Sequence, residues 1–95
     1  MCGIVGLLAP VEAESQQSPS SVVRRMAGTL HHRGPDAQGF VDYPGVSIGM
    51  TRLSIIDLDT GDPPIANEDG SVWVVFNGEI YNYAERRARL IAAGH

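Results

Sequence analysis

Short apolar segments, separated by polar loops, recur along the chain, and their spacing predicts several strands. Residues 4–9 form an apolar run closed by Pro10, which predicts a buried strand near the start of the chain. In residues 46–51, apolar residues alternate with small or polar ones at the period of two expected of a strand. Residues 53–58 predict another short strand segment. Residues 72–76 are continuously apolar, which is typical of a strand covered on both faces.

Helical spacing of apolar residues predicts a first helix from about residue 22 to residue 32. Ser20 or Ser21 is a suitable N-cap, because a hydroxyl there accepts a hydrogen bond from an otherwise unpaired helical N–H. The pair Gly34-Pro35 is expected to end this helix.

A second helix is predicted to begin after Asn82. Glu85 follows Asn82 at the spacing of a capping box, with Asn in place of the usual Ser or Thr. The helix is expected to extend to about Ala93, with Gly94 as the C′ residue that follows the C-cap.

Strands, loops and two helices in this order indicate an α+β fold. Residues 11–21 and 59–70, rich in polar residues and proline, are expected to be loops. Three or four strands with two helices leave sheet faces and edges uncovered. Residues 1–95 are therefore expected to form the N-terminal portion of a larger domain, with its remaining strands beyond His95.

Composition and charge narrow the classes of function. The 95 residues allow at most one small domain, and 43% hydrophobic content is that of a globular protein. A net charge of −4 argues against binding nucleic acid or an anionic membrane, because either needs a basic face. All seven cationic side chains are arginines. A Schiff-base lysine and a Walker-type phosphate-binding lysine are therefore excluded.

Cysteine and histidine usage argues against a metal site. A single cysteine excludes an internal disulfide and a cysteine-rich zinc site. His31 and His32 are adjacent, and neighbours on a helix do not share a ligand face. There is no run of 18 apolar residues, and no basic segment precedes the first apolar run. Neither a membrane span nor a secretory signal is expected, so the cytoplasm is the expected location.

Cys2 is the first candidate for chemistry. Removal of Met1, which is usual before a small residue, would place a thiol and a free α-amino group on one residue. The amine has a pKa of about 7.7–8.0 and can act as a base near neutral pH. Gly3 and Gly6 nearby leave room for a substrate to approach the backbone. The alternative is that Cys2 is simply a small residue tolerated at this position.

Asn77 and Gly78 have two interpretations. Asn-Gly is the favoured sequence of a type I′ hairpin turn, which predicts a tight turn after residue 76. In the other interpretation, the Asn77 amide and the Gly78 N–H form an oxyanion hole for acyl transfer. The residues that follow lead into a helix cap instead of a partner strand, which weakens the hairpin interpretation.

Arg52 is also open to two interpretations, whereas Arg33 has one. Arg52 directly follows the strand predicted at 46–51. Its side chain either lies at the surface or binds a substrate carboxylate through two hydrogen bonds from the guanidinium. Arg33 precedes Gly34, Pro35 and Asp36, a sequence typical of a basic helix end with a Gly-Pro stop.

The candidate residues belong to five motifs that occur in one order along the chain. They are Met1-Cys2-Gly3-Ile4-Val5-Gly6, Arg33-Gly34-Pro35-Asp36 with Gly39, Arg52-Leu53-Ser54-Ile55-Ile56-Asp57-Leu58, Phe76-Asn77-Gly78-Glu79-Ile80-Tyr81-Asn82-Tyr83, and Gly94-His95. Together they resemble the N-terminal glutaminase domain of glutamine-dependent asparagine synthetases. Those domains are class II glutamine amidotransferases of the N-terminal-nucleophile hydrolase type.

The resemblance implies the N-terminal part of a four-layer αββα sandwich, incomplete in this chain. It implies that Cys2 attacks the side-chain amide of glutamine and that Asn77 and Gly78 form the oxyanion hole. The substrate-binding residues that it implies are Arg52 for the α-carboxylate, Glu79 near the α-amino group, and Leu53, Ile55 and Ile56 through backbone contacts.

For the full-length enzyme, the resemblance implies that ammonia passes to a synthetase domain that uses ATP and Mg²⁺ to activate aspartate, with a homodimer as one possible assembly. No cofactor or metal is expected on this segment.

The chain departs from the family pattern at Pro63-Pro64, where Gln-Pro is usual, and at Arg86, where leucine is usual. The family's Ser-Asp segment, whose aspartate binds the substrate ammonium, is expected just beyond His95. Alternatives stay open: an asparagine-synthetase-like amidotransferase with a different acceptor, or a truncated and non-catalytic product. The isolated chain is expected to be largely inactive.

Overall fold

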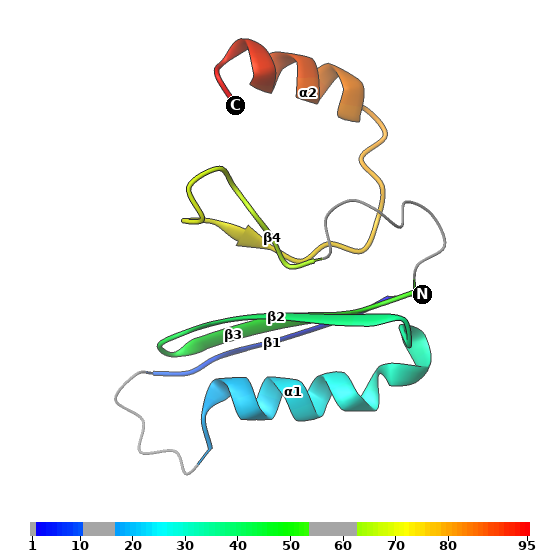
Figure 1. Cartoon of the computed structure of the whole chain (residues 1–95), viewed down its shortest axis with the longest axis vertical. Coiled ribbons are helices and arrows are strands. Elements are labelled where there is room, and N and C mark those ends of the chain that lie inside the picture. The colour runs from blue at the N-terminus through cyan, green and yellow to red at the C-terminus, as the bar shows by residue number, and fades with distance from the viewer. Residues whose placement is uncertain (1, 11–16, 54–62) are drawn as a thin grey trace.

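The computed structural model describes residues 2–10, 17–53 and 63–95, which form a mixed α/β fold with two small sheets. The elements, in chain order, are β1 (Gly3–Leu8), α1 (Pro19–Thr29), the 3₁₀ turn η1 (His31–Arg33), β2 (Ala37–Tyr43), β3 (Val46–Arg52), β4 (Ile65–Ala66), β5 (Trp73–Val74) and α2 (Tyr83–Ala92). In Figure 1, α1, the larger sheet, the β4–β5 pair and α2 follow one another along the long axis of the molecule.

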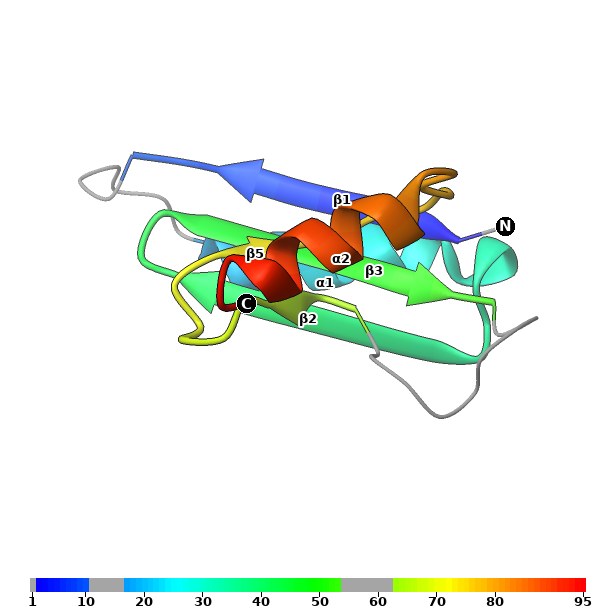
Figure 2. The same ribbon diagram turned by 90° about the horizontal axis from the view of Figure 1, so that it is seen from above.

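The larger sheet has the order β1-β3-β2, and both of its pairs are antiparallel. Figure 2 shows β3 between its two neighbours. β2 and β3 form a hairpin whose turn contains Gly45 at φ 78°, a left-handed conformation that glycine adopts without strain. The strands at residues 3–8 and 46–52 confirm the two strands predicted there, whereas β2 was not predicted from the sequence.

Side chains alternate between the two faces of this sheet because successive residues of a strand point to opposite sides. The face toward α1 carries the hydrophobic core, in which Val5, Val23 and Ala27 are buried. Leu7, Leu30 and Phe40 pack against this cluster. The opposite face of the sheet looks toward β4 and β5 (Figure 1).

The first helix begins and ends earlier than its apolar spacing predicts. Its N-cap is Ser18, not Ser20 or Ser21: the Ser18 side chain accepts a hydrogen bond from the N–H of Ser21. Pro19 then occupies the first turn, where its fixed φ is already helical. The helix ends at Thr29, and the predicted last residues form the separate turn η1, capped by Gly34.

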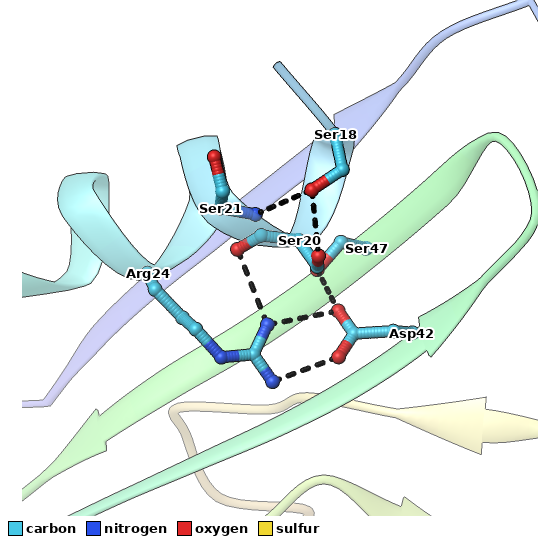
Figure 3. Close-up of polar contacts among 6 residues, drawn as sticks. All are labelled: Ser18, Ser20, Ser21, Arg24, Asp42 and Ser47. Atoms are coloured by element: carbon cyan, nitrogen blue, oxygen red, sulfur yellow. Dashed lines mark hydrogen bonds and ion pairs between the residues drawn. The ribbon is translucent and has the colours of Figure 1, made fainter.

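Arg24 anchors α1 to the larger sheet (Figure 3). Its guanidinium donates to both carboxylate oxygens of Asp42, at 3.2 and 2.8 Å, and to the Ser20 backbone oxygen. The same group lies 4.6 Å from the centre of the Phe40 ring. Ser47, which is buried, donates a short hydrogen bond to Asp42. The hydrogen bonds from Arg24 and then Ser47 hold the pKa of Asp42 below its usual value.

The second sheet is smaller than the apolar run at 72–76 predicts. Only Trp73 and Val74 form a strand, paired with two residues of a segment that was predicted to be loop. Val72 and Phe76 keep 62% and 51% of their surface exposed. The prediction of a strand covered on both faces is therefore wrong, because so short a pair leaves the flanking apolar side chains without a covering layer. The strand segment predicted at 53–58 lies outside the described residues from 54 onward.

Both ends of α2 confirm the prediction, whereas the capping box predicted at its start does not form. Gly94 has φ 98°, and the N–H groups of Gly94 and His95 bond back to the oxygens of Ile91 and Leu90, as in a Schellman motif. Asn82 is the N-cap but makes no side-chain capping hydrogen bond, so no capping box forms. All residues of α2 are exposed, and no helix in the described ranges is long and apolar enough to cross a membrane.

Candidate active site

A cavity of about 300 Å³ lies between the larger sheet and the chain that follows β5. Five of the residues predicted from the sequence line it: Cys2, Arg52, Asn77, Gly78 and Glu79. They come from three separate parts of the chain. The tertiary structure thus gathers a thiol, an arginine, a carboxamide and a carboxylate around one space.

Strand geometry places Cys2 on the side of this cavity. Gly3 and Val5 are buried toward α1, and Cys2, one position before Gly3, belongs to the opposite face. Cys2 is partly exposed and carries a free thiol. A reagent or substrate in the cavity can therefore reach the sulfur.

Asn77 approaches Cys2 directly. The Asn77 Nδ2 donates a long hydrogen bond of 3.4 Å to the backbone oxygen of Cys2. Its neighbour Gly78 is outside the left-handed region, whereas a type I′ turn needs positive φ at both central residues. The predicted hairpin turn is therefore wrong. The segment extends from β5 toward α2 and leaves the Asn77 amide and the Gly78 backbone at the cavity.

Arg52 is the last residue of β3, and the segment after η1 holds its backbone in place. The N–H of Asp36 donates to the Arg52 oxygen at 3.0 Å, and Pro35 forms an isolated bridge to Arg52. A Cβ added to Gly34 would lie 2.5 Å from the Thr51 carbonyl carbon. Gly34 therefore has a second role that its place at a helix end did not reveal: it allows two backbones to meet beside Arg52.

Of the other predicted site residues, only Leu53 lies within the described part of the chain. Leu53 is half-buried but is not one of the residues that line the cavity. Ile55 and Ile56 lie outside the described residues.

Several lining residues were not predicted: Met50, Pro63, Ile65, Val74 and Phe76. Only Met50 had a usable signal, since it lies two positions before Arg52 on the same strand face. Arg33, predicted only as a helix end, also reaches this region: its Nε lies 3.5 Å from the Cys2 backbone oxygen.

The arrangement suits acyl transfer from an amide. It combines a nucleophilic thiol, two N–H donors for a developing oxyanion and a cation for a substrate carboxylate. Within the described ranges, no three His, Cys, Asp or Glu side chains gather as a metal site would require. The acidic residues whose pKa is lowered by hydrogen bonding, Asp42, Glu68 and Asp69, do not line this cavity.

The amino-acid sequence matches one protein family over its whole given length. The family described as "Glutamine amidotransferase domain" matches residues 1–95. The chain is 40% identical over 95 residues to asparagine synthetase [glutamine-hydrolyzing] 1 of Bacillus subtilis. The matched region is 100% of this chain and 15% of that protein. It is 41% identical over 90 residues to the second such synthetase of B. subtilis and to that of Asparagus officinalis, covering 95% of this chain in both cases. The chain spans only 12% and 15% of those two proteins.

Proposed function

Because this chain belongs to the glutamine amidotransferase domain family, we propose that it is the glutaminase part of a glutamine-hydrolysing asparagine synthetase. The observation that carries the proposal is that Cys2, Arg52, Asn77, Gly78 and Glu79 all line the same cavity. The identity of about 40% with asparagine synthetases supports the same assignment. In the complete domain, the layers seen along Figure 1 are proposed to become a four-layer αββα sandwich.

The proposed reaction begins once Met1 has been removed. The Cys2 α-amino group takes the thiol proton, and the sulfur attacks the side-chain amide carbon of glutamine. A C–S bond forms, and the amide oxygen becomes an oxyanion that accepts hydrogen bonds from Asn77 and Gly78. The amine then returns the proton to the leaving nitrogen, the C–N bond breaks and ammonia departs. Water hydrolyses the thioester to glutamate and regenerates the thiol.

Arg52 and Glu79 bind the other end of the substrate in this proposal. The Arg52 guanidinium has the planar fork that pairs with a carboxylate through two hydrogen bonds. Glu79, on the same cavity wall as Asn77, attracts the α-ammonium group. Fixing both ends of glutamine places its amide carbon at the Cys2 sulfur, where reaction becomes effectively unimolecular.

The released ammonia is proposed to reach a synthetase domain in which ATP and Mg²⁺ activate aspartate. Asparagine-synthetase-like enzymes with another acceptor form the second candidate, since the chain spans only 15% and 12% of the two B. subtilis synthetases. A third candidate is a non-catalytic product, which the exposed apolar side chains of α2 and β5 favour if nothing covers them.

The test is glutamine hydrolysis by the natural full-length protein and its Cys2→Ala variant. Wild-type protein is expected to release ammonia and glutamate, and Cys2→Ala is expected to lose at least roughly 10³-fold in kcat. Equal rates in the two proteins would refute the assigned nucleophile. Asparagine formation from aspartate and ATP, compared with other carboxylic acids, identifies the acceptor. The 95-residue chain alone is expected to show little activity.

A further inference from the structure

Thr51 links three elements beneath the candidate active site. It lies opposite Gly3 in the antiparallel pairing of β1 and β3. Its Oγ1 accepts a hydrogen bond from the Gly3 N–H at 3.2 Å and donates one to the Leu30 oxygen, at the end of α1, at 3.5 Å. Thr51 is fully buried, so water cannot replace these contacts.

The fit around Gly3 is close. A Cβ added to Gly3 would lie 2.8 Å from the Thr51 Oγ1 and 2.9 Å from the Leu30 Cδ1. Glycine at this position lets the strand backbone lie directly against the Thr51 hydroxyl. One buried hydrogen bond and close contacts with the Thr51 and Leu30 side chains therefore fix the position of the start of β1.

The same cross-strand pair stands between the proposed nucleophile and the proposed carboxylate-binding arginine. Cys2 precedes Gly3 on β1, and Arg52 follows Thr51 on β3. Because adjacent residues of a strand point to opposite faces, a pair held toward α1 directs both of its neighbours toward the cavity. Cys2 and Arg52 do line that cavity together.

We propose that Thr51 is a positioning residue for glutamine hydrolysis: its hydroxyl holds the Gly3 amide and thereby places Cys2 relative to Asn77 and Arg52. This inference rests on the function proposed above. Thr51 is buried and does not line the cavity, so it is not proposed to contact the substrate. Its effect is geometric, because a displacement of about 1 Å of a reacting group lowers a rate by about 10²-fold.

The test compares Thr51→Val, which keeps the shape and removes the hydroxyl, with Thr51→Ser, which keeps the hydroxyl. Both are made in the natural full-length protein, and kcat is expressed per reactive thiol titrated. Thr51→Val is expected to lower kcat by roughly 10- to 100-fold with KM within about three-fold, since Arg52 remains on β3. Thr51→Ser is expected to stay within about three-fold of wild type in both parameters.

Ser47→Ala is the matched control. Ser47 is the other buried hydroxyl on the same face of β3, and its partner is Asp42, away from Cys2. Loss of this hydrogen bond is expected to lower stability but leave kcat per titrated thiol unchanged. An equal fall in kcat for Ser47→Ala and Thr51→Val would overturn the inference, because it would reflect general damage to the sheet.

A second variant serves if Thr51→Val does not fold. Gly3→Ala keeps the hydroxyl but crowds it, and it is expected to show the same loss of kcat per titrated thiol. Wild-type kcat in either Gly3→Ala or Thr51→Val overturns the inference while the proposed function stands. Activity that survives in Cys2→Ala, or no glutamine hydrolysis by wild-type protein, overturns the proposed function and the inference with it.

Discussion

The side-chain nitrogen of Asn77 lies 3.4 Å from the backbone oxygen of Cys2, although 75 positions separate the two residues. The contact joins the segment after β5 to the start of β1 and puts an amide donor beside the only thiol of the chain. An oxyanion hole requires donors that are already held beside the reacting group before the reaction begins.

Replacing Asn77 by alanine should therefore slow glutamine hydrolysis without abolishing substrate binding. We expect a fall of roughly 10²–10³-fold in kcat with little change in KM, because the lost donor acts mainly on the transition state. Steady-state ammonia release measures both parameters. Asn82→Ala is the control, because Asn82 makes no side-chain capping bond. Unchanged kcat in Asn77→Ala would exclude the assigned oxyanion hole.

Arg52→Lys should chiefly weaken glutamine binding. Lysine keeps the charge but loses the planar fork, so we expect KM to rise roughly ten-fold or more, with a smaller change in kcat. Arg89→Lys, on the exposed helix α2, should leave KM unchanged. A KM in Arg52→Lys equal to that of the control would show that another residue binds the α-carboxylate.

Replacing Gly34 by alanine should lower the stability of the fold, whereas replacing Gly28 by alanine should raise it. At Gly34, the new Cβ would meet the Thr51–Arg52 backbone, and we expect a loss of about 1–3 kcal/mol in the free energy of unfolding. At Gly28, on the exposed face of α1, a Cβ would meet nothing within 4 Å, and better helix propensity should add about 0.5–1 kcal/mol. Urea unfolding of both variants tests the pair. If both variants changed the free energy of unfolding by the same amount and in the same direction, the close approach of Gly34 to the Thr51–Arg52 backbone would be contradicted.

Acidification should weaken the contact between α1 and β2. The pKa of Asp42 is lowered in the folded protein from its ordinary 3.8. A lowered folded-state pKa means that the stabilisation is complete above the unfolded value and is lost as pH falls through the folded value. Between about pH 5 and pH 2, wild-type protein should thus lose more stability than Asp42→Asn. Parallel curves of thermal midpoint against pH for the two proteins would contradict this assignment.

Local rules were sufficient for several elements. The apolar run at the start of the chain and the alternation at 46–51 identified β1 and β3 within one residue at most boundaries. Gly94 ends α2 as predicted, since a C′ glycine acts on carbonyl groups only a few residues away. The start of α1 was misplaced because Ser18, Ser20 and Ser21 are equally suitable caps by type, and only the backbone shows which hydroxyl faces a free N–H.

The strands after residue 60 were harder to predict. A continuous apolar run at 72–76 has the pattern of a buried strand, but the structure pairs only Trp73 and Val74. Burial of Val72 and Phe76 depends on what packs over them, and periodicity carries no information on that. β2 was missed although Phe40 and Val41 precede a Pro-Gly turn, the one local signal that marked its end.

For the candidate site, the sequence by itself determined which chemical groups are available: one thiol, an Asn-Gly pair and an arginine at a strand end. Only the tertiary structure decided that Cys2, Arg52 and Asn77 share one cavity and that Gly34 and Thr51 support it. The physical reason is the distance along the chain over which each kind of interaction acts. Caps, turns and strand alternation act between residues a few positions apart, whereas the contacts of Cys2 with Asn77 and of Gly3 with Thr51 exist only after distant segments have packed together.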